Sequence, residues 1–94
     1  MAERRVVFRV HALGRMFQRG ITIEDVHRVL AEGEVIEDYP TDTPYPSRLI
    51  LGWCGNRPLH LVVSYNTVGD ETIVITAYEP DPQKWDSQFK RRRP

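Results

Sequence analysis

The sequence predicts an α+β domain in which two N-terminal helices pack on one face of a four- or five-stranded, mostly antiparallel sheet. Two observations predict this class. Apolar residues recur at helical spacing over residues 11–19 and 22–33. From residue 34 onward, short runs rich in β-branched and aromatic residues alternate with turn-forming clusters. A chain of 94 residues, 40% of them hydrophobic, is expected to fold as a single domain over residues 1–94.

The two helices have clear boundary residues. The first, over residues 11–19, is expected to turn Ala12 and Met16 towards the core, with Leu13 as a third candidate, and to end at Gly20. The second begins at Thr22, an N-cap with an acidic residue three positions later, and ends at Gly33. A short strand or an extended lead-in over residues 5–10 precedes both helices.

The remaining strands are marked by the turns between them. Residues 34–39 and 48–53 are predicted strands, and the segment 40–47 between them holds three prolines and must be an irregular loop. Residues 58–85 have the pattern of an antiparallel hairpin around a turn cluster at 66–71. After the second run of the hairpin, Trp85 and Phe89 are expected to pack back on the domain. The second sheet face is then either open or covered by the tail.

Alternation along the hairpin singles out one histidine. Successive strand residues point to opposite faces, so His60 shares a face with Thr76 and Tyr78 if the apolar residues of the two runs pack together on the core. Those apolar sets are Leu59, Leu61, Val63 and Tyr65 in the first run, and Ile73, Ile75 and Ala77 in the second. The face would carry an imidazole, a hydroxyl and a phenol on rigid strands, which suits a site. A slip of one residue would move the whole set to the other face.

Composition excludes several classes of protein. The apolar runs are too short to cross a bilayer, and the N-terminus lacks the apolar stretch of a signal peptide, so a cytoplasmic protein is expected. The single cysteine, Cys54, forms no internal disulfide, and the histidines show no metal-ligand spacing. No metal and no cofactor are therefore predicted. The acidic residues Glu34, Glu37 and Asp38 are interpreted as a solvated strand edge.

The net charge of zero conceals an uneven distribution. Residues 1–20 carry five arginines and one acid, residues 21–47 carry seven acids and one arginine, and a basic tail occupies residues 90–94. Arginine outnumbers lysine by eleven to two. Because the guanidinium fork binds phosphate in a bidentate manner, this bias is compatible with an RNA or phosphate partner. A solvated surface is the alternative explanation.

Three groups of residues could carry chemistry. His11, Arg15 and Arg19 fall at i, i+4 and i+8 and could grip phosphate, with His11 available for proton transfer, or could form a solvated helix face. His60 is either a functional imidazole or a satisfied core histidine bonded to Tyr78 or to a backbone carbonyl. The tail arginines would attract a phosphate backbone or stay solvated; they are Arg91, Arg92 and Arg93.

Nearly the whole chain resembles a family of small prokaryotic proteins of formally unknown function, a DUF-type family. That family is similar to the RelE, MqsR and barnase-like ribonuclease toxins, and its members are often encoded beside a zinc-finger antitoxin of the YgiT/MqsA type. The resemblance rests on these segments: His11-Ala12, Arg15-Met16, Arg19-Gly20-Ile21, Glu24-Asp25-Val26, Gly33-Glu34-Val35-Ile36-Glu37, Pro46-Ser47-Arg48-Leu49, Arg57-Pro58-Leu59-His60, Val62-Val63, Ile75-Thr76-Ala77-Tyr78-Glu79-Pro80 and Trp85.

The resemblance implies a RelE/barnase-like fold and metal-independent cleavage of RNA, with mRNA as the expected substrate, by attack of the ribose 2′-hydroxyl on the adjacent phosphate. Carried over by position, His11 and His60 would be the acid–base candidates, and Arg15 would hold the scissile phosphate. Tyr78 would orient the phosphate or share proton transfer. Arg19, Arg91, Arg92 and Arg93 would bind the RNA backbone. The implied partner is a cognate zinc-finger antitoxin.

Two other functions stay open at this point. One is a non-catalytic module on the same fold that binds protein or RNA; convergence of His11, Arg15, His60 and Tyr78 around one cleft would argue against it, whereas scatter of these residues or a His60 buried in apolar packing would favour it. The other is a homodimer formed through an exposed strand edge, in which Tyr45 and Trp53 would be buried.

Overall fold

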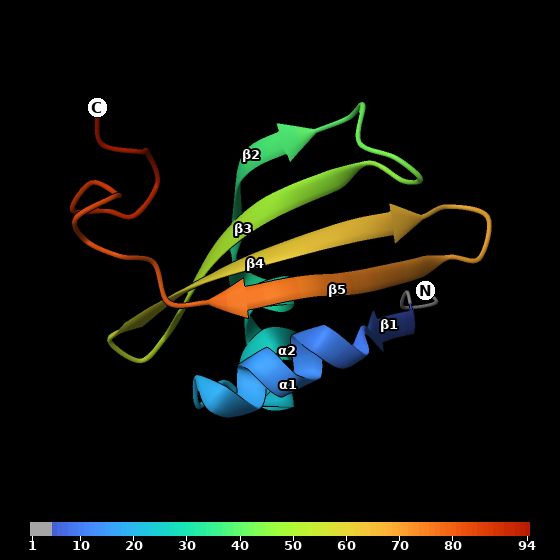
Figure 1. The fold of residues 1–94 in the computed structure, drawn as a ribbon, viewed down its shortest axis with the longest axis horizontal. Helices are drawn as coiled ribbons and strands as arrows, with labels where there is room; N and C mark the ends of the chain where they lie inside the picture. The colour runs from blue at the N-terminus through green and yellow to red at the C-terminus, as the bar shows by residue number, and fades with distance from the viewer. Residues whose placement is uncertain (1–4) are drawn as a thin grey trace.

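The computed structural model describes residues 5–94 and has two helices and a five-stranded sheet (Figure 1). In chain order the elements are β1 (Arg5–Phe8), α1 (Val10–Gln18), α2 (Ile23–Glu32), β2 (Glu34–Tyr39), β3 (Ser47–Cys54), β4 (Arg57–Asn66) and β5 (Glu71–Tyr78). The strands lie side by side in the order β1-β5-β4-β3-β2. The predicted α+β class with two N-terminal helices is confirmed. No helix within residues 5–94 combines the length and the hydropathy needed to cross a membrane.

The sheet is mixed, which corrects the expectation of a mostly antiparallel one. β1 runs parallel to β5, with Arg5 opposite Glu71 and Phe8 opposite Val74, whereas the other three pairings are antiparallel. Almost the whole domain separates β1 from β5 in the sequence, so no hairpin turn fixes their relative direction. Side-chain alternation reports which face a residue occupies and carries no information about the direction of pairing.

One face of the sheet and the two helices enclose the core. α1 contributes Ala12 and Met16, and α2 contributes Val26 and Val29. Leu13, the third candidate on α1, is 41% exposed and lies outside the core. The capping box predicted at Thr22 is present, since its hydroxyl accepts from the Asp25 amide and the Asp25 carboxylate accepts from the Thr22 amide. From the strands, the buried core residues are Ile50, Leu59, Leu61, Val63, Val74 and Ala77.

A bulge in β5 changes the face of several residues. His60 lies opposite Tyr78, on the shared face that alternation predicts, but the pairing then shifts, so that Val62 faces Thr76 and Val63 faces Val74. The extra residue, Ile75, reverses the alternation for the first half of the strand. Val74 is consequently buried in the core while Ile73 and Ile75 are half-buried. Of the three β5 residues predicted to face the core, only Ala77 belongs to it.

The C-terminal tail packs on the second face of the sheet, one of the two arrangements expected for it. In Figure 1 the tail leaves the end of β5 and curls back beside the ends of the neighbouring strands. Trp85 is 4% exposed and pairs through its backbone with Arg92. Lys90 forms an ion pair with Glu34 at 3.1 Å, so the basic tail is fastened to β2.

Gly33 allows α2 to pass closely into β2, and we expect Gly33→Ala to destabilise the fold by about 3 kcal/mol. A Cβ atom at this position would lie 2.4 Å from the Val29 carbonyl oxygen and 2.8 Å from that of Leu51, both of which are backbone atoms. Urea unfolding of the variant measures the loss. Gly14→Ala is the matched control, because a Cβ there meets nothing within 4 Å and should stabilise α1 by up to about 1 kcal/mol. Equal midpoints for the two variants would contradict the prediction.

Candidate functional site

His60 lies at the centre of the second sheet face and is completely buried. Its Nε2 is 2.8 Å from the backbone oxygen of Phe89, and its Nδ1 is 3.2 Å from the hydroxyl of Tyr78. A carbonyl oxygen can only accept, so Nε2 carries the proton and Nδ1 accepts one from the Tyr78 hydroxyl. The hydrogen bonds therefore fix both the tautomer of His60 and the direction in which the Tyr78 hydroxyl points.

Burial determines the charge state of this pair. It lowers the pKa of His60, against the opposing effect of the hydrogen bond to Phe89. Burial also raises the pKa of Tyr78, while the charges of Arg92 and Arg19 lower it. Trp85 completes the enclosure, with its ring centroid 4.5 Å from that of His60 in an edge contact. His60 is thus a neutral, fully hydrogen-bonded imidazole that solvent does not reach.

The depressed pKa of His60 predicts a specific loss of stability in mild acid. Between the folded-state pKa and the unfolded value of about 6.5, the unfolded chain binds a proton at His60 that the folded chain does not. The free energy of unfolding should therefore fall as the pH drops below about 6.5, by up to about 1.4 kcal/mol per pH unit from this residue. Urea unfolding between about pH 5 and pH 7.5 measures the slope.

Two histidine variants separate this contribution from others. His60→Gln should flatten the slope, because glutamine does not titrate. His27→Gln is the matched control, since His27 is exposed on α2. The interpretation fails if the His27 variant flattens the slope as much as the His60 variant does.

A second polar cluster stands on β2, on the same sheet face. The Tyr39 hydroxyl donates to Glu37 Oε1. Arg92 from the tail lies 3.4 Å from Glu37 Oε2 through Nε, and its guanidinium stacks 4.7 Å above the ring of Trp85. The hydrogen bond to Glu37 raises the pKa of Arg92. A carboxylate, a guanidinium and a phenol thus lie together beside the buried histidine.

A bulge aims Glu37 at this face. The pairing of β2 with β3 shifts between Val35 and Glu37, so Ile36 is the extra residue and Glu37 lies opposite Leu49. Without the shift, alternation would place Ile36 on the same face as Glu34 and would turn Glu37 to the helix side. The interpretation of Glu37 as part of a solvated strand edge is therefore wrong, because its side chain is 26% exposed and holds two partners. Its neighbours Glu34 and Asp38 do remain exposed.

The two clusters influence one another electrostatically. The charges of Glu37 and Arg92 act on the pKa values of both His60 and Tyr78, with Glu37 raising and Arg92 lowering each. One sheet face therefore presents a carboxylate that can accept a proton, a phenol that can donate one and a cation that can bind an anion. These groups are Glu37, Tyr39, His60, Tyr78 and Arg92.

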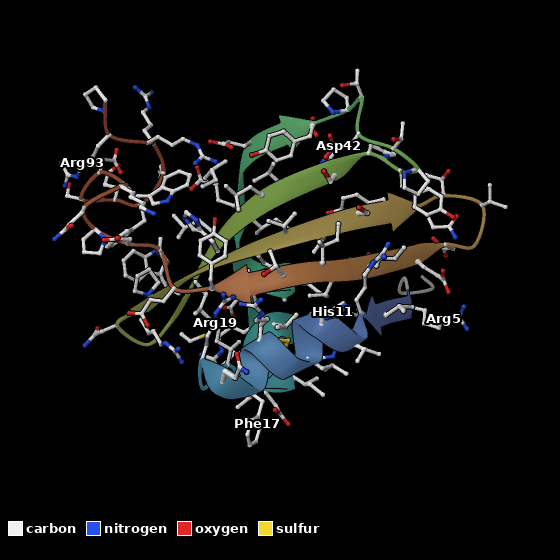
Figure 2. All side chains as sticks on the ribbon, in the orientation of Figure 1. Arg5, His11, Phe17, Arg19, Asp42 and Arg93 are labelled. Atoms are coloured by element: carbon white, nitrogen blue, oxygen red, sulfur yellow. The ribbon has the colours of Figure 1, made fainter. Side chains whose placement is uncertain are left out.

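The predicted site residues on α1 lie elsewhere. His11 lines a surface hollow with Glu71 and Ile73, at the start of β5, whereas Tyr78 ends that strand, about 17 Å further along. Arg15, one turn after His11 on α1, is exposed. Figure 2 shows His11 and Arg19 at opposite ends of α1. The structure consequently brings His60 and Tyr78 together and leaves His11 and Arg15 outside their cluster.

Arg19 lies nearest to the cluster among the α1 candidates. Its Nη1 donates to the backbone oxygen of Ala77 at 2.8 Å, and it lines a groove of about 470 Å³ with Arg57, Tyr78 and Glu79. Arg57 is held by the backbone oxygens of Arg19 and Gly20 and by the Glu79 carboxylate. This groove offers guanidinium donors along the edge of β5, next to the phenol of Tyr78.

Sequence reasoning identified part of this arrangement and missed part of it. It missed Glu37 and Tyr39 as site residues, and it treated Arg92 only as one of three tail arginines. The available signal was the alternation of Glu37 and Tyr39 near a strand end, which becomes informative only once the bulge is known. Arg93 contributes a backbone contact, its Nε donating to the Pro82 oxygen, and Arg91 is exposed.

Comparisons with known proteins give a family and no function. Residues 8–79 match a family profile described as a domain of unknown function (DUF4258). No curated protein and no solved structure matches the chain. Within residues 5–94, no three His, Cys, Asp or Glu side chains come together as a metal-binding group.

Proposed function

The chain belongs to the DUF4258 family, whose description assigns no function, and we propose from the site itself that it is a toxin-type endoribonuclease that cleaves RNA without a metal ion. One observation carries the proposal: a proton acceptor, a proton donor and a guanidinium occupy one sheet face within electrostatic reach of one another. The resemblance to RelE, MqsR and barnase-like toxins supports the same chemistry. The proposed substrate is RNA, chiefly mRNA, so the chain would act in the cytoplasm.

The proposed reaction uses each group for one step. Glu37 accepts the proton of the ribose 2′-hydroxyl, whose oxygen attacks the adjacent phosphorus. Arg92 stabilises the additional negative charge on the phosphoryl oxygens. As the bond from phosphorus to the 5′-oxygen breaks, the Tyr78 hydroxyl releases its hydrogen bond to His60 Nδ1 and gives its proton to that oxygen. The products are a 2′,3′-cyclic phosphate and a free 5′-hydroxyl.

The remaining residues support these groups. His60 is buried and cannot contact RNA, so its role is to hold the Tyr78 hydroxyl through Nδ1. Burial raises the pKa of Tyr78 above its ordinary value, and the charges of Arg92 and Arg19 offset part of that rise. The proton on Glu37 returns to Tyr78 through water, and the cycle closes. His11, Arg15, Arg91 and Arg93 are assigned to contacts along the RNA backbone.

The test is cleavage of a mixed-sequence RNA by the purified chain in excess EDTA, with analysis of the product ends. Cyclic phosphate ends are expected, and the same oligonucleotide with 2′-deoxyribose should stay intact because it lacks the nucleophile. Induced expression should also arrest growth and degrade cellular RNA. Cleavage of the deoxy oligonucleotide, or a requirement for an added divalent ion, would refute the mechanism.

A non-catalytic binding module is the second candidate, and two observations favour it: His60 is buried, and His11 and Arg15 lie outside its cluster with Tyr78. The ring is 0% exposed, both of its nitrogens are bonded within the chain, and Glu37 is neutralised by Arg92. The same contacts also fit a purely structural role, in which they hold the tail against the sheet. RNA that binds in the EDTA assay and stays uncut would support this candidate.

A zinc-finger antitoxin remains the proposed protein partner, on the strength of the resemblance. A complex of the two chains that suppresses RNA cleavage would support it. Self-association through a strand edge also stays a prediction, with Trp53 46% exposed and Tyr45 half-buried.

A further inference from the structure

The groove beside Tyr78 at the end of β5, here called the arginine groove, has the composition of an anion site. It measures about 470 Å³ and is lined by Arg19, Arg57, Tyr78 and Glu79. β1 pairs only with the first half of β5, so within residues 5–94 no strand lies against the second half on this edge. Figure 2 shows Arg19 between α1 and this end of β5, where its Nη1 donates to the Ala77 oxygen. The groove is therefore an open edge equipped with two guanidinium groups.

The chain holds the Arg57 guanidinium in one orientation. Its Nη1 donates to the Gly20 oxygen at 2.8 Å, its Nη2 to the Arg19 oxygen at 2.6 Å, and its Nε to the Glu79 carboxylate at 2.9 Å. A guanidinium has five N–H groups, so one remains on each Nη for a ligand. Because the side chain is already fixed, a ligand that binds it loses little affinity to side-chain ordering.

The charge of the arginine groove matches a phosphodiester. Glu79 forms an ion pair with Arg57 and compensates one of the two guanidinium charges. The bond from Arg19 goes to a backbone oxygen, which compensates no charge. One positive charge therefore remains, and a phosphodiester carries one negative charge. Its two free oxygens also suit the planar donor fork of arginine, whereas a doubly charged phosphate monoester would be repelled more strongly by the Glu79 carboxylate.

We propose that the arginine groove binds the phosphodiester that follows the scissile phosphate in an RNA chain. This inference rests on the proposed function, in which Tyr78 gives its proton to the leaving 5′-oxygen. Glu37 acts on the 2′-hydroxyl from β2, with β3 and β4 between it and β5. The leaving nucleotide is therefore on the β5 side, and its next linkage extends past Tyr78 into the groove. The preferred substrate is then an RNA that continues by at least one charged linkage beyond the cleaved one.

The test uses two tetranucleotides that differ in the charge of one linkage. Each has a ribonucleotide at its second position and deoxynucleotides elsewhere, so it can be cut only at the linkage after the ribose. The next linkage is a phosphodiester in one and an uncharged methylphosphonate in the other. In EDTA, kcat/KM of the wild-type chain should be at least about tenfold higher for the phosphodiester. Versions with deoxyribose at the second position bind without being cut, and their Kd values should differ in the same direction.

Protein variants assign this difference to the groove. Arg57→Gln should bring the ratio of kcat/KM for the two tetranucleotides close to one. Loss of the contacts between Arg57 and the end of α1 would affect both tetranucleotides equally, so the ratio reports the contact with the charged linkage. If Arg57→Gln does not fold, Arg19→Gln is used in its place and should also lower the ratio.

Arg5→Gln is the matched control. Arg5 also pairs with a carboxylate of β5, Glu71, but at the other end of that strand, and its side chain is 73% exposed. It should keep the wild-type ratio. If it lowers the ratio as much as Arg57→Gln does, general positive charge explains the preference and the groove assignment is overturned.

The outcomes separate this inference from the proposed function. Cleavage of both tetranucleotides with equal kcat/KM would overturn the groove assignment and leave the ribonuclease proposal in place. Tighter binding of the phosphodiester form, lost in Arg57→Gln, with no cleavage of either tetranucleotide would refute the ribonuclease proposal and support the groove as a phosphodiester site. Absence of both binding and cleavage would overturn both.

Discussion

Replacing Glu37 with glutamine is expected to reduce RNA cleavage by at least about a hundredfold while the chain stays folded. The amide has nearly the same size as the carboxylate but cannot accept the proton of the 2′-hydroxyl. The ion pair with Arg92 is lost, yet the Arg92 side chain is 64% exposed, and pairs of this kind contribute about 1 kcal/mol or less. The rate of cleavage in EDTA and the urea midpoint are measured on the same preparation.

Glu34→Gln is the matched control for this experiment. Glu34 is on the same strand and is also paired with a tail residue, Lys90, but its side chain is 57% exposed and lies outside the cluster. It should keep wild-type cleavage. If both variants cleave RNA equally well, Glu37 is not the base. If both lose activity equally, attachment of the tail matters and the carboxylate at position 37 has no special role.

The features of the fold that could be predicted from sequence are those encoded within a few residues. Thr22 and Asp25 form the capping box because the contact spans three positions, and alternation along two neighbouring strands was sufficient to place His60 and Tyr78 on the same face. Apolar spacing likewise identified Ala12 and Met16 as core residues. In each case the physical signal is local, so a single stretch of sequence contains it.

The features that could not be predicted depend on distant parts of the chain. The bulges in β2 and β5 add one residue each and reverse the alternation. The extra residues, Ile36 and Ile75, are of a type common in regular strands, so the sequence gives no sign of either bulge. The parallel pairing of β1 with β5 depends on where the chain re-enters the sheet. The pairing of Arg92 with Glu37 joins residues 55 positions apart. Of these features, the bulge in β2 and the pairing of Arg92 with Glu37 decide which side chains share the site.

Trp85→Ala should have the largest effect on stability, with an expected loss of about 3–4 kcal/mol. The indole is 4% exposed, packs perpendicular to the His60 ring and carries the Arg92 guanidinium on its face. Removing it leaves a cavity above a buried imidazole and deprives the tail of its anchor. Urea unfolding measures the loss, and trypsin should cut the loosened tail at Lys90 and the arginines that follow, which the wild type protects better.

Trp53→Ala supplies the comparison for this variant. Trp53 is 46% exposed, and its ring centroid lies 6.0 Å from that of Phe89 in an edge contact. Its removal should therefore lower the free energy of unfolding clearly less. Equal losses would mean that the tail is not part of the cooperative fold. The distinction bears on the site, because the family match ends at residue 79 while Trp85, Phe89 and Arg92 enclose His60 from beyond that point. A large effect at Trp85 would therefore make the tail a working part of the candidate site, and RNA cleavage should fall with it.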